Sequence, residues 1–193
     1  RVVLWSMDCY PDAAERFGEI RPGGLASRIL RRATRWAFGR LDHVVALDGA
    51  MAELLSSQYA SADHPPCTVG PNWERAALFP PRPADTPAGD GPVRLLYLGN
   101  IGVGHRFDTV IAAAAELGDE AAFDFIGGGA RRDQLVADAA ALGLRNLDVE
   151  GYRPKTSTPE LLAGADAALI TLDDRSLGVI SPSKLHSSLG AGL

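Results

Sequence analysis

Short apolar runs alternate with longer segments in which apolar residues recur every three or four positions. The short runs, which are typical of strands buried on both faces, stand at residues 2–7, 43–47, 93–98, 123–126, 147–150 and 167–172. The segments with helical spacing or composition are 25–38, 48–59, 108–117, 131–142 and 159–163. This repeated succession of strand and helix predicts an α/β protein with parallel sheets.

Loop-forming residues interrupt this succession between positions 72 and 92. Proline and glycine are dense there and leave few places for regular structure. We therefore expect a first α/β domain in residues 1–73, a linker in 74–92 and a second α/β domain in 93–193. The chain begins inside a predicted strand and stops where a helix is ending, so we expect a fragment of a longer protein.

Composition narrows the function classes. The 193 residues carry a net charge of −5, which argues against bulk attraction to nucleic acid. Cys9 and Cys67 have neither metal-ligand spacing nor a disulfide framework, as expected in a reducing compartment. No apolar run approaches the roughly 18 residues that suggest a membrane span. These features favour a cytoplasmic protein without a metal site or a nucleic-acid partner.

Glycine-rich loops follow three of the predicted strands. Because right-handed crossovers bring the carboxyl ends of parallel strands to one edge, we expect Gly99, Gly127 and Gly151 to meet there with Ser181. Such loops expose backbone N–H groups that bind phosphate, although each could also be a tight turn without a ligand. Phe107 stands where a dinucleotide fingerprint requires its third glycine, which argues against a dehydrogenase.

A lysine at the start of the last predicted helix is the most informative cation. The run Ser181, Pro182, Ser183 and Lys184 marks a helix start near Ser181 or Pro182. A cation near a helix N-terminus is unfavourable unless an anion offsets it. The position therefore predicts that Lys184 binds an anion, and a lysine directed into solvent is the alternative.

Arginines accompany the apolar stripe of the predicted helix at residues 25–38. The basic segment that runs from Arg28 to Arg40 could lie against anionic lipid, as basic amphipathic helices do. Alternatively its arginines are simply solvated, and the stripe with Leu25, Ile29 and Trp36 covers the sheet. We expect the stripe to cover the sheet, and peripheral membrane contact stays open.

In order and spacing, several segments resemble the motifs of family-4-like bacterial glycosyltransferases of the GT-B fold. The matching segments are LWSMDCYP at 4–11, GPNW at 70–73, LYLGNIG at 96–102, FIGGG at 125–129, EGY at 150–152, GVISPSKL at 178–185 and GAGL at 190–193. The resemblance covers nearly the whole chain. Single segments are generic, but their combination is specific.

The resemblance implies two Rossmann-like domains that face each other across a cleft. Residues 1–73 would be the C-terminal part of the acceptor-side domain, and residues 93–193 most of the domain that binds a nucleotide sugar. The family implies sugar transfer with retained anomeric configuration, usually without a metal, so that the nucleotide sugar is a substrate and no cofactor is expected. A glycan or lipid-linked acceptor, and a location at the inner face of the membrane, would follow from the same likeness.

Site residues follow from the resemblance position by position. Asp8 would lie on the acceptor side, with no catalytic base assigned. The donor-binding residues would be Gly99, Asn100, Gly102, His105, Arg106, Gly127, Gly128, Gly151, Tyr152, Ser181, Ser183, Lys184 and Ser187. Gly151 and Tyr152 would lie beside the nucleotide base, and the loops at 99–106 and 181–184 would surround the diphosphate and sugar.

Two departures from the family pattern concern the donor site. Many relatives carry an arginine and a lysine in the first donor loop, where this chain has Asn100 and His105, with Arg106 as a substitute cation. Many also carry a glutamate where Ser187 stands. Two other functions therefore stay open: a sugar-nucleotide epimerase of the same fold, with His105 as its candidate residue, and a non-catalytic nucleotide-binding module. On any of these interpretations the fragment alone is expected to be inactive.

Overall fold

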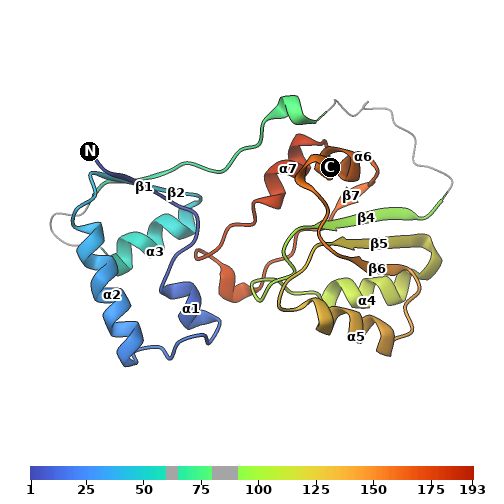
Figure 1. The fold of residues 1–193 in the computed structure, drawn as a ribbon, viewed down its shortest axis with the longest axis horizontal. Coiled ribbons are helices and arrows are strands. Elements are labelled where there is room, and N and C mark those ends of the chain that lie inside the picture. The colour runs from blue at the N-terminus through green and yellow to red at the C-terminus, as the bar shows by residue number, and fades with distance from the viewer. Residues whose placement is uncertain (60–64, 80–90) are drawn as a thin grey trace. The chain divides into compact units, whose positions relative to one another are not determined.

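The computed structural model describes residues 1–59, 65–79 and 91–193, which form two compact units (Figure 1). The first unit contains Arg1–Asn72 together with Leu172–Ser181, and the second contains Trp73–Thr171 and Pro182–Leu193. The second unit begins at Trp73, where the first predicted domain ends, and the chain returns to the first unit at Leu172. Residues 80–90 of the predicted linker lie outside the described residues.

The first unit is a parallel sheet with helices packed on it. Its strands are β1 (Val3–Ser6), β2 (His43–Ala46) and β3 (Cys67–Val69), in the order β1-β2-β3. Its helices are α1 (Asp12–Arg16), α2 (Leu25–Phe38) and α3 (Gly49–Tyr59), with a 3-10 turn at Asp174–Ser176. The backbone N–H of Met51 donates to Asp48 Oδ1 at 2.8 Å, so Asp48 caps the N-terminus of α3.

Helix α2 turns its polar face toward the rest of its unit. Phe38 is buried and Arg31 is largely covered, whereas Leu25, Ile29 and Trp36 are 76%, 58% and 62% exposed. The expectation that the apolar stripe covers the sheet is therefore wrong.

A polar cluster beneath α2 explains this orientation. Arg31 Nη2 lies 2.8 Å from Asp12 Oδ1 and 2.5 Å from Glu15 Oε2, and both carboxylates are on the preceding helix. The hydroxyls of Tyr59 and Ser27 donate to Asp12 and Glu15 respectively. Buried carboxylates without a cation are costly, so Arg31 must face inward. Leu25 and Ile29 lie on the opposite side of the helix and are left outside.

The second unit is also a parallel sheet, in the order β6-β5-β4-β7. The strands are β4 (Val93–Leu98), β5 (Ala121–Ile126), β6 (Leu147–Glu150) and β7 (Ala167–Ala168). The helices are α4 (Asp108–Leu117), α5 (Arg132–Ala141), α6 (Thr158–Ala163) and α7 (Lys184–Gly190), with 3-10 turns at Ala76–Leu78, Gly118–Glu120 and Lys155–Ser157. Helices α4 and α5 lie on one face of the sheet, and α6 and α7 lie on the other (Figure 1).

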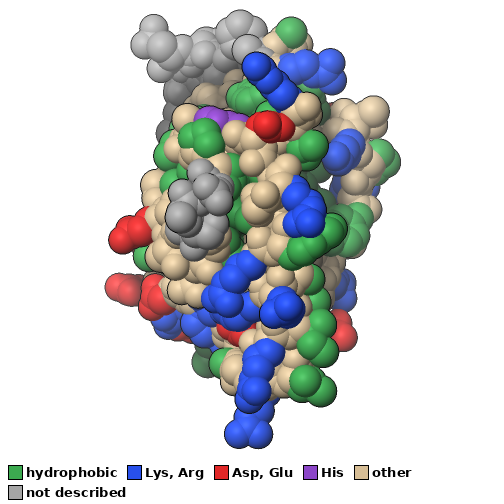
Figure 2. All heavy atoms as spheres, turned by 90° about the vertical axis from the view of Figure 1, so that its left-hand side faces the viewer, with side chains coloured by type: hydrophobic (Ala, Val, Ile, Leu, Met, Phe, Trp, Pro, Cys, Tyr) green, Lys and Arg blue, Asp and Glu red, His purple; other side chains and the backbone are tan. Residues whose placement is uncertain are grey.

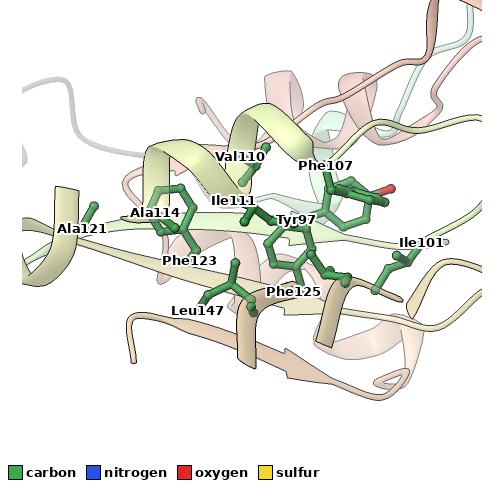
Figure 3. Close-up of a cluster of buried hydrophobic side chains, with 12 residues drawn as sticks. Tyr97, Ile101, Phe107, Val110, Ile111, Ala114, Ala121, Phe123, Phe125 and Leu147 are labelled. Carbon is green, nitrogen blue, oxygen red and sulfur yellow. The ribbon is translucent and has the colours of Figure 1, made fainter. Parts of the chain in front are cut away.

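Aromatic side chains fill the core between the sheet and α4. Tyr97, Phe107, Phe123 and Phe125 are buried together there (Figure 3). Ala114 is fully covered, so the small side chains of α4 let this helix approach the strands closely. The core thereby fixes the carboxyl end of β4, where the first glycine loop begins.

The strand predicted at residues 167–172 is mostly absent. Only Ala167 and Ala168 pair with β4, at the edge of the sheet. The carbonyl of Thr171 accepts instead from a histidine side chain, and from Leu172 the chain packs with the first unit. The strand is short because it lies at the edge of the sheet and because the chain leaves for the first unit at Leu172.

Candidate functional site

Three glycine loops begin side by side at one edge of the second sheet. Strands β4, β5 and β6 end in register, because Leu98 pairs with Ile126 and Ile126 with Glu150. The N–H of Gly99 donates to Ile126 O at 2.9 Å, and the N–H of Gly127 donates to Glu150 O at 3.0 Å. The predicted meeting of these loops is confirmed for Gly99, Gly127 and Gly151.

The first two loops pack backbone against backbone. A Cβ at Gly127 would overlap the carbonyl oxygen of Gly99, and a Cβ at Gly129 would lie 2.5 Å from Ile101 O. The N–H of Ile101 donates to Gly128 O at 2.7 Å. Loop packing alone therefore requires these glycines, and their presence does not by itself indicate a phosphate site.

Lys184 places an ammonium group against this edge. Its Nζ lies 3.6 Å from the ring centroid of Tyr97, is shielded from solvent and has no hydrogen-bond partner among the residues that the structure describes. A Cβ built at Gly99 would be 3.7 Å from Lys184 Cε, so the side chain lies next to the first loop. Burial lowers the pKa of Lys184 to about 7. The observed helix α7 begins at Lys184, two to three residues later than predicted.

Tyr97 forms the platform beneath this ammonium. Its ring stacks on Phe125 and meets Phe107 edge-on, with centroid distances of 5.1 and 5.3 Å. Its hydroxyl donates to Asn100 O at 2.7 Å. Burial raises the pKa of Tyr97, so the phenol is neutral and its ring attracts the cation through its π face. Sequence reasoning gave Tyr97 no role because an aromatic residue in a buried strand predicts only core.

His105 is a buried, neutral part of the first loop. It is buried, and its Nδ1 lies 2.6 Å from Thr171 O, so Nδ1 carries the proton and donates to this carbonyl. Burial and then the charge of Lys184 lower the pKa of His105, which keeps the imidazole neutral. Arg131 Nη1 donates to the His105 carbonyl at 2.7 Å. Arg131 thus connects the first and second loops, a role that the sequence pattern did not indicate.

Arg106, the predicted substitute cation, pairs with its own neighbour. Its Nη2 lies 2.6 Å from Asp108 Oδ2 and its Nε lies 3.2 Å from Asp108 Oδ1. This two-pronged ion pair holds the guanidinium at the start of α4. Arg131 and Lys184 therefore lie against the first loop without a carboxylate partner in the described part of this unit, and of the two only the Lys184 ammonium also has no hydrogen-bond partner there.

The remaining donor-site residues of the second unit differ in exposure. Tyr152 is exposed and its hydroxyl donates to Gly128 O at 3.1 Å, so its ring covers the second loop. Gly151 and Ser183 are exposed. The hydroxyl of Ser187 donates to Lys184 O, 3.1 Å away within the same helix.

The side chain of Asn100 lies beside Gly102. A Cβ built at Gly102 would be 2.8 Å from Asn100 Nδ2. The second glycine of the first loop therefore leaves room for the side chain of Asn100.

Asp8 and Ser181 belong to the first unit. Asp8 forms an isolated antiparallel bridge with Ile180, and the N–H of Cys9 donates to Val179 O at 2.9 Å. Partial burial raises the pKa of Asp8. The predicted acceptor-side residue is thus held beside the segment that leads to Ser181.

Comparison with known proteins gives relatives in one enzyme class. No family model matches the chain. It is 27% identical over 196 residues to the probable glycosyltransferase WbjE of Pseudomonas aeruginosa, and 28% identical over 203 residues to the putative colanic acid biosynthesis glycosyl transferase WcaI of Escherichia coli. These alignments cover 98% and 100% of the chain but 48% and 49% of the relatives. The chain therefore spans about half the length of the curated relatives it matches.

Solved structures show the same fold at low sequence identity. Anabaena Alr3699/HepE, solved with UDP-glucose, superposes on 98% of the chain and 51% of its own, with a TM-score of 0.70 and 15% identity. The pneumococcal O-GlcNAc transferase GtfA, solved with UDP and GlcNAc, covers 86% of the chain and 31% of its own, with a TM-score of 0.61 and 16% identity. The predicted fold, two Rossmann-like parts of GT-B type, is confirmed. In the described part of the chain no helix is long and apolar enough to cross a membrane.

Proposed function

The chain resembles bacterial glycosyltransferases of the GT-B fold, and from this premise we propose that it holds the nucleotide-sugar site of such an enzyme. The complete protein would transfer the sugar to a glycan or lipid-linked acceptor with retained anomeric configuration. A lipid-linked acceptor lies in a membrane, so the proposal includes peripheral contact through the segment from Arg28 to Arg40. One relative is named for the biosynthesis of a polysaccharide, colanic acid, which supports this class of acceptor.

The observation that carries the proposal is the buried ammonium of Lys184. A buried cation without a hydrogen-bond partner is costly, as its lowered pKa shows. A diphosphate oxygen beside the first loop would accept from the ammonium and restore its charge. Glycine loops at the carboxyl edge of a parallel sheet are also where α/β proteins bind phosphate.

The chemistry follows from the leaving group. The bond between the anomeric carbon and the diphosphate oxygen breaks and its electron pair goes to that oxygen. The acceptor oxygen bonds to the same carbon, and its proton passes to the departing diphosphate. Lys184 would stabilise the negative charge that develops on the diphosphate. Tyr97 would hold the ammonium in place, Tyr152 would lie beside the base, and Asp8 would serve the acceptor. The proposal assigns neither a catalytic base nor a metal.

Replacing Lys184 tests the donor site. Its charged hydrogen bond is typically worth about 1.5–3 kcal/mol, so Lys184→Ala should weaken binding of a nucleoside diphosphate by roughly ten- to a hundredfold. Binding of the matching nucleoside should change little. Lys155→Ala is the matched control, because Lys155 is the other lysine of the chain and is exposed. The measurement is calorimetric titration of the complete protein with UDP, GDP, ADP and dTDP.

Equal diphosphate affinity in the complete protein and in its Lys184→Ala variant would remove Lys184 from the site. Arg106 would then be the next cation to replace.

The products formed from a nucleotide sugar distinguish a glycosyltransferase from an epimerase and from a non-catalytic binding module. Incubation of the complete protein with labelled nucleotide sugars should yield a transferred sugar, and NMR of the product should show retained configuration. Interconversion of the donor sugar would favour the epimerase, and binding without turnover would favour the non-catalytic module. The epimerase rests on His105, whose imidazole is neutral and tied to Thr171.

A further inference from the structure

Arg131 stands at the N-terminal end of α5, where a positive charge is unfavourable. It is the N-cap residue of this helix, and its side chain makes no capping hydrogen bond. Basic side chains on a surface are ordinary, and Figure 2 shows them gathered on one face of the molecule. Arg131 differs because its contacts lie outside its own helix, and within the described residues none of them is with a carboxylate.

Arg131 holds the first glycine loop, residues 99–106, at two places. Its backbone N–H donates to Ile101 O at 2.9 Å, and its guanidinium Nη1 donates to His105 O at 2.7 Å. The next residue, Arg132, reaches elsewhere, because its Nη2 donates to Val149 O in β6 at 3.2 Å. Of these two neighbouring arginines, Arg131 alone is hydrogen-bonded to the first loop in the described part of the chain.

These two hydrogen bonds fix the direction of two peptide groups in the loop. The peptide bonds after Ile101 and His105 are trans, so each carbonyl points opposite to the N–H of the following residue. Because both carbonyls point to Arg131, the N–H groups of Gly102 and Arg106 point away from it. Gly102 is buried, and its N–H donates to none of the residues that the structure describes. A buried N–H without an acceptor is rare in native proteins, which indicates that a ligand supplies the acceptor.

His105 connects this arrangement to the ammonium of Lys184. Its carbonyl is held by Arg131 and its imidazole Nδ1 lies 2.6 Å from Thr171 O, so the residue is fixed at both ends. The imidazole meets the ring of Tyr97 edge-on at a centroid distance of 5.8 Å, and Lys184 Nζ lies 3.6 Å from the centroid of the same ring. The oriented loop and the ammonium therefore share one support.

The first loop depends on other parts of the unit for positive charge. His105 is neutral, and Arg106 pairs with Asp108 at 2.6 Å. The two cations without a carboxylate partner in the described part of this unit that contact the loop are Lys184 from α7 and Arg131 from the start of α5. The guanidinium of Arg131 therefore adds a potential that attracts an anion to the loop whose carbonyl it holds.

We propose that Arg131 is a positioning residue of the donor site, which keeps the carbonyls of Ile101 and His105 turned away from the diphosphate. A carbonyl oxygen that faced the diphosphate would repel it, whereas the N–H groups on the other side of the same peptides attract it. This inference rests on the proposed donor site and adds a residue that acts through the loop. The side chain is responsible for the His105 end alone, because the hydrogen bond to Ile101 comes from the backbone.

Calorimetric titration of the complete protein with UDP, GDP, ADP and dTDP tests the role of the guanidinium. Arg131→Met keeps an unbranched side chain but removes its donors, so it should weaken binding of the nucleoside diphosphate that the wild type binds by about tenfold. Binding of the matching nucleoside should stay unchanged. Arg132→Met is the matched control and should leave both affinities unchanged, because its guanidinium does not contact the first loop. Arg131→Lys should recover part of the loss, since an ammonium can also donate to His105 O.

Hydrogen exchange of the unliganded protein measures the loop without a ligand. In Arg131→Met, peptides that cover residues 102–107 should exchange faster than in the wild type, and β5 should keep its protection. Loss of protection in β5 as well would mean that the guanidinium supports the whole unit, and would overturn its specific role.

The binding results separate this inference from the proposed donor site. A wild-type protein that binds no nucleoside diphosphate would overturn the donor site and, with it, the role of Arg131. If the wild type binds a diphosphate and Arg131→Met binds it no differently from Arg132→Met, the role of Arg131 alone is wrong. An equal loss of nucleoside and diphosphate affinity in Arg131→Met would likewise overturn that role, because the guanidinium then has no specific effect on the diphosphate.

Discussion

The ammonium of Lys184 is buried against the ring of Tyr97 and shielded from water. With its pKa at about 7, the free ammonium loses its proton around neutral pH, far below the ordinary lysine range. An anion bound to Nζ favours the charged form and raises the pKa again. Binding of an anionic ligand and binding of a proton are therefore coupled at this residue.

This coupling predicts a pH-dependent affinity for nucleoside diphosphates. At pH 8 most unliganded molecules carry a neutral Lys184, so binding should take up close to one proton. The dissociation constant should rise by up to about tenfold per pH unit above pH 7, until the pKa of the complex is reached. Calorimetry at pH 8 in buffers of different ionisation enthalpy measures the uptake, and Lys184→Met should abolish it. Equal uptake in the variant would assign the proton to another group.

At the scale of elements, the loops after β4 and β5 behave as one packed unit. Gly127→Ala would drive a Cβ into the carbonyl of Gly99 and should lower the free energy of unfolding by about 2 kcal/mol or more. Gly151→Ala is the matched control at the end of β6, since no atom lies within 4 Å of its added Cβ. Urea unfolding of the two variants should separate them. Equal stability would show that the loops can move apart.

Arg31 should be the most important arginine for the stability of α2. Arg31→Met leaves the carboxylates of Asp12 and Glu15 buried without a cation and should cost about 3–5 kcal/mol. Arg32→Met, on the exposed side, should cost less than about 0.5 kcal/mol. Urea unfolding at pH 7 measures both. A loss no larger than that of Arg32→Met would mean that water replaces the missing cation.

The same cluster should weaken in acid. The hydrogen bond from Arg31, followed by that from Ser27, lowers the pKa of Glu15 below its value in the unfolded chain. The resulting stability is present above pH 4.5 and is lost as pH falls through the lower, folded pKa. Arg31→Met should remove most of this acid dependence.

The sequence pattern predicted the positions of helices and strands better than it predicted which side of each helix is buried. The strands at 93–98 and 147–150 and the helices at 25–38 and 108–117 were found with their observed bounds, because their patterns are local. The buried side of α2 was not predicted correctly, because an amphipathic pattern defines an apolar side and a polar side but does not show which of them faces the rest of the unit. The decision depends on Asp12 and Glu15, which only the fold brings to Arg31. Likewise the sequence predicted that the three glycine loops meet at one edge of the second sheet, whereas it did not predict the contact of Lys184 with Tyr97.

At the scale of the whole molecule, the chain does not finish one unit before it begins the next. Leu172–Ser181 leaves the second unit and packs with the first, where Arg16 Nη1 donates to Leu177 O at 2.6 Å. The chain then returns at Pro182 to form α7. No local pattern indicates such a path, because the residues in contact lie more than 150 positions apart.

Val179 should stabilise the first unit although it lies near the end of the chain. It is fully buried with Cys9 and Ala13, so Val179→Ala should lower the free energy of unfolding by about 1–3 kcal/mol. Leu177→Ala, two residues earlier and largely exposed, is the matched control. Hydrogen exchange should show faster exchange in β1 and β2 for the first variant alone. Faster exchange confined to the second unit would contradict the observed packing.

This chain path has a consequence for biosynthesis. The amide of Cys9 finds its partner, the carbonyl of Val179, only after 170 further residues have been added, which takes roughly 10–30 s at 5–20 residues per second. Throughout that time the ribosome-bound chain displays an unfinished apolar surface that a chaperone can bind. Nascent chains arrested before Leu172 should therefore remain protease-sensitive in residues 1–59, and protection should begin once Ser181 has emerged.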